Sequence, residues 1–355
     1  MSDVTLKVAV AGVGGYAGAE LARLLLAHPR LQHQPPLFLA RAADHAEATL
    51  PLEQLHPSLA RGGDHTLPVV HPFSWQLIEQ HQIDLVFLAL PHETSRASVP
   101  EWIERDIKVI DLSGAWRLDD PTNRAVYNFS DQNPHLAATL QEEAVYGLPE
   151  LHREFIACAR LVANPGCYAT SIILALQPLL KAGLVDRARG IICDSKSGVS
   201  GAGKSPTAKT HFMYAADNLS AYSVFNHRHT GELLEQLGLT DQQIQFTPHL
   251  LPIPRGILST IYLHLNQQHT PDSIEACLRT FYASSPMVRI HRTPSLPQIQ
   301  YVDRTSYCDL GFELAPDGKR LVLVSCLDNL LKGAASQAIQ NMNLIAGYPE
   351  EEGLL

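Results

Sequence analysis

The stretch Val8-Ala-Val-Ala-Gly12-Val-Gly-Gly15-Tyr-Ala-Gly18 decides the fold of the amino-terminal half of the chain. A short apolar strand over residues 6–11 runs into a glycine-rich turn and then into a helical pattern over residues 15–28. The glycines at positions 12, 15 and 18 permit a tight turn, a close approach of the backbone to a pyrophosphate, and close packing of the helix on the strand. The stretch therefore predicts a dinucleotide site, and the alternative is a glycine-rich turn that binds nothing.

The end of the second predicted strand, residues 35–40, bears on which dinucleotide binds. Sites for NAD usually carry Asp or Glu about 20 residues after the glycines, where the carboxylate binds the ribose hydroxyls. This chain has Arg41 there, and a guanidinium suits the 2′-phosphate of NADP. The sequence thus favours NADP(H), although Arg41 as an exposed loop charge, with Asp44 close by, is the alternative.

The remaining apolar segments predict two domains. Strand patterns at 84–90 and 109–112 alternate with helical segments, which is typical of a parallel sheet covered on both faces. In the second half, strand-like segments alternate with loops that contain Pro and Gly, which indicates an α+β domain on a mostly antiparallel sheet. These strand-like segments span residues 191–194, 258–265 and 321–326. We predict a Rossmann-type domain over 1–150, completed by a carboxyl-terminal segment 328–355, and an α+β catalytic domain over 151–327. The final helix is expected over 329–345.

Composition excludes several classes of function. The net charge of −9 and the absence of a basic run argue against a nucleic-acid partner. No apolar run approaches the roughly 20 residues that span a bilayer, and the amino terminus lacks the pattern of a signal peptide. The six cysteines are widely spaced without a CxxC pair, which favours reduced thiols in the cytoplasm over a zinc site. No metal is predicted.

A second informative stretch is Asn164-Pro-Gly-Cys167-Tyr-Ala-Thr170, in which a sharp turn opens a helix. The helical pattern runs from Tyr168 to a stop at Gly183, and Pro178 inside it is expected to kink or split the helix. A thiol at a helix N-terminus is favoured as the thiolate by the helix dipole and nearby N–H groups. Cys167 is therefore a candidate nucleophile, and an inert buried cysteine is the alternative.

A nucleophilic cysteine needs an acid–base partner, and the segment 226–232 (NHRHTGE) is the densest source of candidates. If the segment is extended, His227 and His229 point to the same side. If Thr230 caps a helix, Glu232 lies in the first turn and orients a histidine. A solvated polar loop is the alternative. Three cations are candidates for holding an acidic substrate or are ordinary surface charges: Lys204, Arg228 and Arg255.

A thiol beside a bound nicotinamide suits the reduction of an acyl phosphate. A free carboxylate resists hydride, whereas a thiolate displaces phosphate from an acyl phosphate to give a thioester that accepts hydride readily. The thiohemiacetal that results collapses to an aldehyde with the help of an acid–base group.

Matching segments run nearly end to end and include GVGGYAGAEL, NPGCYAT, SGVSGAGK, NHRHTGE and DNLLKGAA. By these segments the chain resembles the N-acetyl-gamma-glutamyl-phosphate reductases, the arginine-pathway members of the aspartate-semialdehyde dehydrogenase-like group. The resemblance implies that Cys167 is the nucleophile and His229 the acid–base, with His227 as second choice. It also implies a homodimer or homotetramer in which the second domain carries the dimer contact.

The same resemblance implies the binding residues. Those for NADPH would be Gly12, Gly15, Tyr16, Gly18, Arg41 at the 2′-phosphate, and Ser197, Gly198 and Asn329 at the nicotinamide. Those for the substrate would be Arg117, Lys204 and Glu232.

Three other functions are compatible with the residues. The nearest is the same chemistry on aspartyl phosphate or on an aminoadipyl phosphate attached to a carrier protein. A cysteine hydrolase using Cys167 and His229 would have no need of the glycine fingerprint. A non-catalytic nicotinamide sensor would bind NADP while its thiol stayed unreactive.

Overall fold

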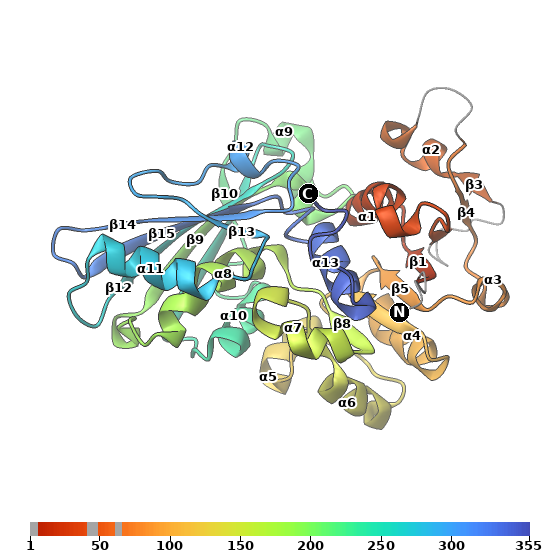
Figure 1. Cartoon of the computed structure of the whole chain (residues 1–355), viewed down its shortest axis with the longest axis horizontal. Helices are drawn as coiled ribbons and strands as arrows, with labels where there is room; N and C mark the ends of the chain where they lie inside the picture. Colours follow the sequence, from red (N-terminus) through yellow and green to blue (C-terminus); the bar gives the residue numbers. More distant parts are fainter. Residues whose placement is uncertain (1–5, 41–48, 61–65) are drawn as a thin grey trace. The chain divides into compact units, whose positions relative to one another are not determined.

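The computed structural model describes residues 6–40, 49–60 and 66–355, and the chain divides into two compact units (Figure 1). The first unit comprises residues 1–117, 127–164 and 334–355, and the second comprises 118–126 and 165–333. The chain thus leaves the first unit after Asn164, not after 150, because β7 (Val145–Tyr146) and β8 (Leu161–Ala163) belong to the first sheet. It returns at Ala334, later than the expected 328.

Among the described residues of the first unit, eight strands form one sheet in the order β3-β4-β2-β1-β5-β6-β8-β7. All neighbours are parallel except β3 and β4. The remaining strands are β1 (Val8–Ala11), β2 (Leu37–Leu39), β3 (Leu50–Pro51), β4 (Val69–His71), β5 (Leu85–Leu88) and β6 (Lys108–Asp111). The strand order reverses between β1 and β5, which is where doubly wound sheets bind their ligands.

Helices cover both faces of this sheet. One face packs its apolar side chains against α3 (Trp75–His81), α4 (His92–Glu104) and α6 (Pro134–Glu143). On the other side α13 (Ala335–Ala346) packs against α1 (Tyr16–Ala27), α7 (Pro149–Cys158) and β6. The short α2 (Leu52–Leu55) follows β3. The predicted parallel sheet with two covered faces is confirmed.

The second unit is built on a seven-stranded sheet in the order β10-β11-β9-β12-β15-β14-β13. Four neighbouring pairs are antiparallel, whereas β11–β9 and β13–β14 are parallel, so the predicted mostly antiparallel sheet is confirmed. The strands are β9 (Ile191–Gly198), β10 (Ser220–Ala221), β11 (Ile244–Leu251), β12 (Ile257–His264), β13 (Val288–Ile290), β14 (Cys308–Leu314) and β15 (Arg320–Leu327).

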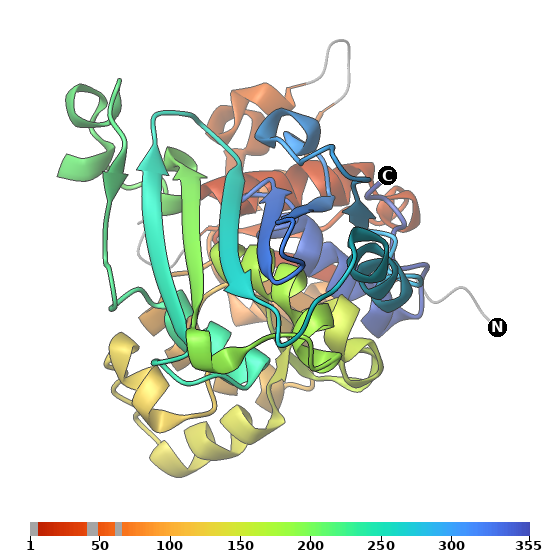
Figure 2. The ribbon, with the colours of Figure 1, turned by 90° about the vertical axis from the view of Figure 1, so that its left-hand side faces the viewer.

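The two faces of this second sheet differ. One face packs against α8 (Cys167–Lys181), with α10 (His229–Leu237) and α11 (Pro271–Phe281) against α8. The other face packs against the short α12 (Ile299–Val302) and against Leu296 in the segment before it, near β15. Figure 2 looks onto this second face, and no helix lies in front of β9, β11 and β12. The unit also contains α5 (Pro121–Arg124) and α9 (Phe212–Ala215).

Two predicted helix boundaries are wrong. The final helix begins at Ala335 and not at Asn329, because residues 329–334 form turns, and the Asp328 carboxylate before them accepts the Leu330 N–H at 2.8 Å. Helix α8 is not split at Pro178 but continues to Lys181. Proline has no N–H for the carbonyl of Leu174, four residues earlier, and that carbonyl instead accepts the buried Tyr282 hydroxyl at 2.5 Å.

Candidate active site

Cys167 is the first residue of α8, so its side chain lies at the helix N-terminus that the sequence predicted. It is half-buried. Two nearby glycines, Gly333 and Gly166, have no space for a side chain. A Cβ on Gly333 would lie 2.7 Å from the Cβ of Cys167, and a Cβ on Gly166 would lie 2.5 Å from Nε2 of His229. The turn therefore needs glycine on both sides of the thiol, and the imidazole of His229 faces the residue that precedes it.

A buried carboxylate joins this turn to the histidine. Helix α10 begins at His229 with Arg228 as its N-cap, so neither the extended segment nor the Thr230 cap considered from the sequence is present. Glu232 does lie in the first turn of α10, as the second alternative required. Its side chain is fully buried; one oxygen accepts the Gly166 N–H at 2.9 Å, and the other lies 4.0 Å from Nε2 of His229. Glu232 is thus placed to orient both the cysteine turn and His229.

His227 has different surroundings. Its ring packs edge-on against Tyr168, Tyr222 and Phe246, with centroids 5.6, 5.6 and 5.2 Å away. Its Nδ1 accepts the backbone N–H of His229 at 3.1 Å. Burial, and to a lesser extent the Arg228 guanidinium, lower the pKa of His227 to about 4. His227 is therefore neutral near pH 7 and holds the start of α10.

These residues line a cavity of about 250 Å³ within the second unit. The hydroxyls of Tyr168 and Tyr222 lie 3.5 Å apart, and Tyr168 donates to the carbonyl of His249 at 2.8 Å. Burial raises the pKa of Tyr168 above its ordinary range and that of Tyr222 to about 12, so both are neutral hydroxyls. The lining comprises Cys167, Tyr168, Ser197, Gly201, Ala202, Thr207, Lys209, Thr210, Ser220, Tyr222, His227, Arg228, His229 and Leu250.

The cations of the cavity differ in part from those singled out in the sequence. Arg228 lines it, as does Lys209, whose ammonium lies 5.9 Å from the centre of the Tyr222 ring. Lys204 is exposed and is not among the lining residues. Arg255 is paired with the buried Asp328 carboxylate at 3.1 Å. Nothing in the local sequence around Lys209 distinguishes it from a surface lysine, because residues far apart in the chain define the cavity.

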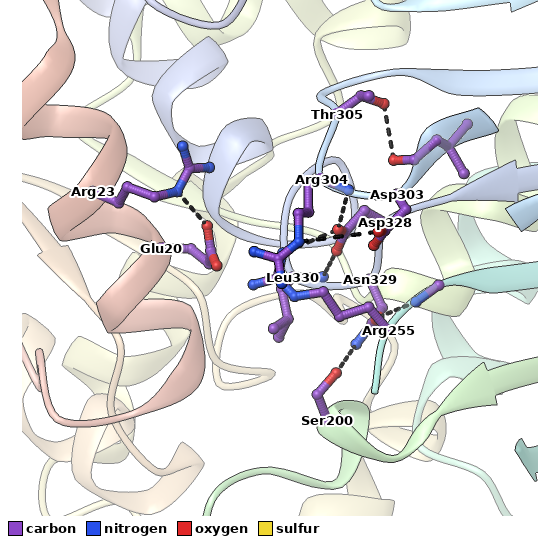
Figure 3. A network of polar contacts seen from close by, with 12 residues as sticks. Glu20, Arg23, Ser200, Arg255, Asp303, Arg304, Thr305, Asp328, Asn329 and Leu330 are labelled. Atoms are coloured by element: carbon purple, nitrogen blue, oxygen red, sulfur yellow. Dashed lines mark hydrogen bonds and ion pairs between the residues drawn. The ribbon is translucent and has the colours of Figure 1, made fainter. Parts of the chain in front are cut away.

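Three of the residues expected at the nicotinamide come together in the second unit. Asn329 accepts the Gly256 N–H at 2.8 Å and donates to the Ser200 hydroxyl at 2.9 Å, so it ties the loop after β9 to the start of β12 (Figure 3). The neighbouring Asp328 fixes this arrangement through Arg255 and through the Arg304 N–H at 2.9 Å. Ser197 and Gly198 end β9 beside it, and a Cβ on Gly198 would lie 2.7 Å from the backbone nitrogen of Arg255.

The glycine-rich turn of the first unit has the shape of a phosphate cradle. Gly12 has φ +86°, and its Cβ would lie 2.5 Å from the carbonyl oxygen of Ala89. A Cβ on Gly18 would lie 2.6 Å from the carbonyl oxygen of Gly12. The fold itself therefore requires both glycines. A Cβ on Gly15, the N-cap of α1, would meet nothing nearer than 4.0 Å, so the fold leaves space at this helix N-terminus. That space fits a pyrophosphate.

Two further candidates lie in or near the first unit. Tyr16, at the first helical position of α1, is 43% exposed. Arg117 is buried, and its guanidinium donates to the carbonyls of Asn164 and Leu112 at 2.7 and 2.8 Å. Its expected contact with substrate stays a prediction. Arg41 lies outside the described residues, so the expected contact with a 2′-phosphate also stays a prediction.

Two family models match the chain along the division into units. Residues 7–159 match the semialdehyde dehydrogenase NAD-binding domain, and residues 167–329 match the semialdehyde dehydrogenase dimerisation domain. Together with the cysteine turn and the glycine cradle, these matches define a class: an oxidoreductase of the semialdehyde dehydrogenase type with a nicotinamide dinucleotide as its cofactor.

Curated relatives give the finer assignment. The N-acetyl-gamma-glutamyl-phosphate reductase of Desulforapulum autotrophicum is 42% identical over 98% of both chains, and that of Desulfotalea psychrophila is 43% identical over the same share. The chain therefore belongs to the N-acetyl-gamma-glutamyl-phosphate reductase family.

Solved structures agree with the fold. Aspartate semialdehyde dehydrogenase II from Vibrio cholerae superposes with a TM-score of 0.68 at 18% identity, covering 97% of this chain and 98% of that one. A probable aspartate-semialdehyde dehydrogenase from Pseudomonas aeruginosa gives 0.65 at 20% identity over 96% and 98%. At these identities the likeness concerns the fold alone. No helix in the described part of the chain is both long and apolar enough to span a membrane.

Proposed function

We propose that the chain reduces N-acetyl-gamma-glutamyl phosphate to N-acetyl-L-glutamate 5-semialdehyde and phosphate, with NADPH as cofactor, in arginine biosynthesis. The observation that carries the proposal is the cavity in which Cys167, at the start of α8, meets His229 and two cations. The names of relatives that match over nearly their whole length support the choice of substrate.

The thiolate of Cys167 attacks the acyl carbon of the substrate, and the bond to phosphate breaks to leave a thioester. The helix N-terminus and the glycine-lined turn favour the thiolate. Arg228 and Lys209 supply positive charge to the cavity, where the carboxylate and phosphate of the substrate bring negative charge.

Bound NADPH would supply the hydride that reduces the thioester, and Gly12, Gly15 and Gly18 of the first unit would hold its pyrophosphate. When the C–S bond then breaks, the oxygen of the thiohemiacetal loses its proton, the aldehyde leaves, and the Cys167 thiolate is restored. His229 is the group that handles this proton, and the buried Glu232 carboxylate orients it. His227, which is neutral near pH 7, is not suited to that task.

We also propose how the chain assembles and where it acts. The match to a dimerisation domain supports a homodimer or homotetramer. The open face of the seven-stranded sheet is the surface that we assign to the dimer contact. None of the six cysteines forms a disulfide, which supports a cytoplasmic location.

The decisive experiment runs the reaction backwards, which avoids the unstable acyl phosphate. The purified protein is given N-acetylglutamate semialdehyde, phosphate and NADP, and the reduction of NADP is followed. Activity that requires phosphate and prefers NADP over NAD supports the proposal. Activity with aspartate semialdehyde alone keeps the chemistry and changes the substrate, and NADP binding without any turnover favours a sensor.

The nucleophile is tested in the same assay. Cys167→Ser is expected to lower turnover by roughly 10³-fold or more, because the alcohol is a far weaker nucleophile than the thiolate. Cys158→Ser is the matched control, since Cys158 is exposed at the end of α7, and its activity is expected to equal that of the unaltered protein. Full turnover by Cys167→Ser contradicts the covalent mechanism.

A further inference from the structure

The chain passes between the two units at four places, which follow residues 117, 126, 164 and 333. The first-unit residues at three of these crossing points are Arg117, Asn164 and Ala334, and hydrogen bonds join them. Arg117 Nε donates to the main-chain carbonyl of Asn164 at 2.7 Å, and Asn164 Nδ2 donates to the carbonyl of Ala334 at 3.1 Å. Asn164 is thus bonded to the residues at two other crossing points.

Asn164 is fully buried, and each of its four polar groups has a partner. Its N–H donates to the carbonyl of Asp111 at 2.8 Å, and its Oδ1 accepts from Nδ2 of Asn341 on α13 at 3.1 Å. The Asn341 amide is fixed in turn by the carbonyl of Gly147 at 2.9 Å. The side chain must both donate and accept at this position, which is what a primary amide does and a carboxylate or an apolar group does not.

The two segments that touch the nucleophile continue from these bonded residues. Cys167 follows Asn164 by three positions, across the Pro165–Gly166 turn. Gly333, which packs against the Cβ of Cys167, directly precedes Ala334. The bond from the Asn164 side chain to Ala334 therefore fixes the origin of both segments at once.

We propose that Asn164 is a positioning residue for Cys167: its side chain holds the crossing points at 164 and 333 together, and its main-chain carbonyl accepts from Arg117. The inference rests on the proposed function, because it treats Cys167 as the nucleophile. If Asn164 had only a structural role, its replacement would lower turnover no more than the loss of similar buried hydrogen bonds elsewhere. A positioning role predicts a larger loss of turnover.

The main variant is Asn164→Asp, which keeps the size and the Oδ1 acceptor but places a second oxygen against the carbonyl of Ala334. Asn164→Ser, which shortens the side chain without adding charge, is the second variant. The control is Gln340→Ala. Gln340 is also fully buried on α13, and its amide donates to Glu150 and Glu350 at 3.1 and 2.6 Å, neither of which is a crossing-point residue.

Two readouts are taken on the full-length enzyme. In the phosphate-dependent reduction of NADP, both Asn164 variants are expected to lower kcat by roughly 10- to 100-fold, because a shift of about 1 Å at a reacting group has an effect of that size. The KM for the aldehyde and the affinity for NADP are expected to stay within about threefold. Hydrogen exchange is expected to rise together in segments 161–167 and 333–338, which the Asn164 side chain joins, and in the control to rise only along α13.

The inference is overturned if kcat falls no further in the Asn164 variants than in Gln340→Ala, or if exchange rises around residue 164 alone. If the unaltered enzyme shows no turnover with N-acetylglutamate semialdehyde, the proposed function fails. In that case the exchange pattern still decides whether Asn164 holds the crossing points together.

Discussion

His227 and His229 lie two residues apart, but their rings have different neighbours. His227 is enclosed by Tyr168, Tyr222 and Phe246 and accepts a backbone N–H, so protonation removes a hydrogen bond and charges a buried ring. His229 lies beside Glu232, with its Nε2 4.0 Å from a carboxyl oxygen. We therefore propose the acid–base role for His229, and we infer that His227 stabilises the fold only while neutral.

A pH dependence of stability follows from the lowered pKa of His227. Because the folded-state pKa is about 4 and the unfolded one about 6.5, the unfolded chain binds more protons between these values. Stability contributed by His227 is full above pH 6.5 and is lost as the pH falls towards 4, by roughly 3 kcal/mol at most. Urea unfolding of His227→Asn, which keeps an acceptor for the His229 N–H, is expected to lack this acid-side slope. An equal slope in both proteins contradicts the assignment.

Two glycines of the cradle are expected to be needed for different reasons: Gly18 for the packing of the fold, and Gly15 for binding of the cofactor. Gly18→Ala places a Cβ 2.6 Å from a backbone oxygen and is expected to lower stability by several kcal/mol or to prevent folding. Gly15→Ala meets nothing nearer than 4.0 Å, so thermal stability should change little while affinity for NADP falls at least about tenfold. Thermal unfolding and NADP titration of both variants check this. Unchanged NADP affinity in Gly15→Ala places the pyrophosphate elsewhere.

At the scale of elements, the end of α8 shows how a proline is accommodated within a helix. Tyr282, which caps α11, donates its hydroxyl to the Leu174 carbonyl that Pro178 leaves without a helical partner. Tyr282→Phe leaves that buried carbonyl unsatisfied and is expected to lower the free energy of unfolding by about 1–3 kcal/mol.

The pairing is tested by a double-mutant cycle. Pro178→Ala restores a backbone N–H at the position that normally bonds Leu174, so Tyr282→Phe should be less destabilising in the Pro178→Ala background by about 1 kcal/mol or more. Urea unfolding of the four proteins gives the coupling. Strict additivity of the two substitutions contradicts the explanation.

Sequence patterns predicted the elements that are continuous and apolar and missed those with mixed composition. The strands β1, β5 and β6 read as buried apolar runs, and all three are present. The strand β11 was missed because Pro248 and alternating polar residues interrupt its pattern, although its partner β9 pairs along its whole length. Strand β9 itself extends four residues past the predicted end at 194, because Ser195 and Ser197 face inward and bond or pack there without apolar character.

The same limit applies to the site. The helix that starts at Cys167 is a local event, visible as a turn followed by an apolar periodicity. The contact of Glu232 with the Gly166 N–H joins residues 66 positions apart and has no local signature. The bonds of Asn164 to Arg117 and Ala334 are likewise products of tertiary structure. The sequence could single out Cys167 as a candidate nucleophile but not the residues that hold its turn in place.

At the scale of the whole molecule, we propose that the open face of the seven-stranded sheet carries the contact between two copies of the chain. Ile192 and Tyr262 are directly opposite each other on β9 and β12 and are 47% and 45% exposed. The charges beside them are compensated within the face, since Asp194 pairs with Lys196 at 2.6 Å and with His249 at 3.1 Å. A face with exposed apolar side chains and balanced charges is suited to burial against a second copy.

Ile192→Asp is therefore expected to weaken the dimer by at least about 30-fold, because it places an uncompensated carboxylate in an apolar contact. The control is Phe155→Asp, which also replaces an exposed apolar side chain with a carboxylate. Phe155 is 69% exposed and lies on α7 of the first unit, whereas the seven-stranded sheet belongs to the second. Sedimentation equilibrium over a range of protein concentrations measures both dissociation constants. If Ile192→Asp dissociates no more readily than Phe155→Asp, the dimer forms through a different surface, and the open face of the sheet needs another explanation.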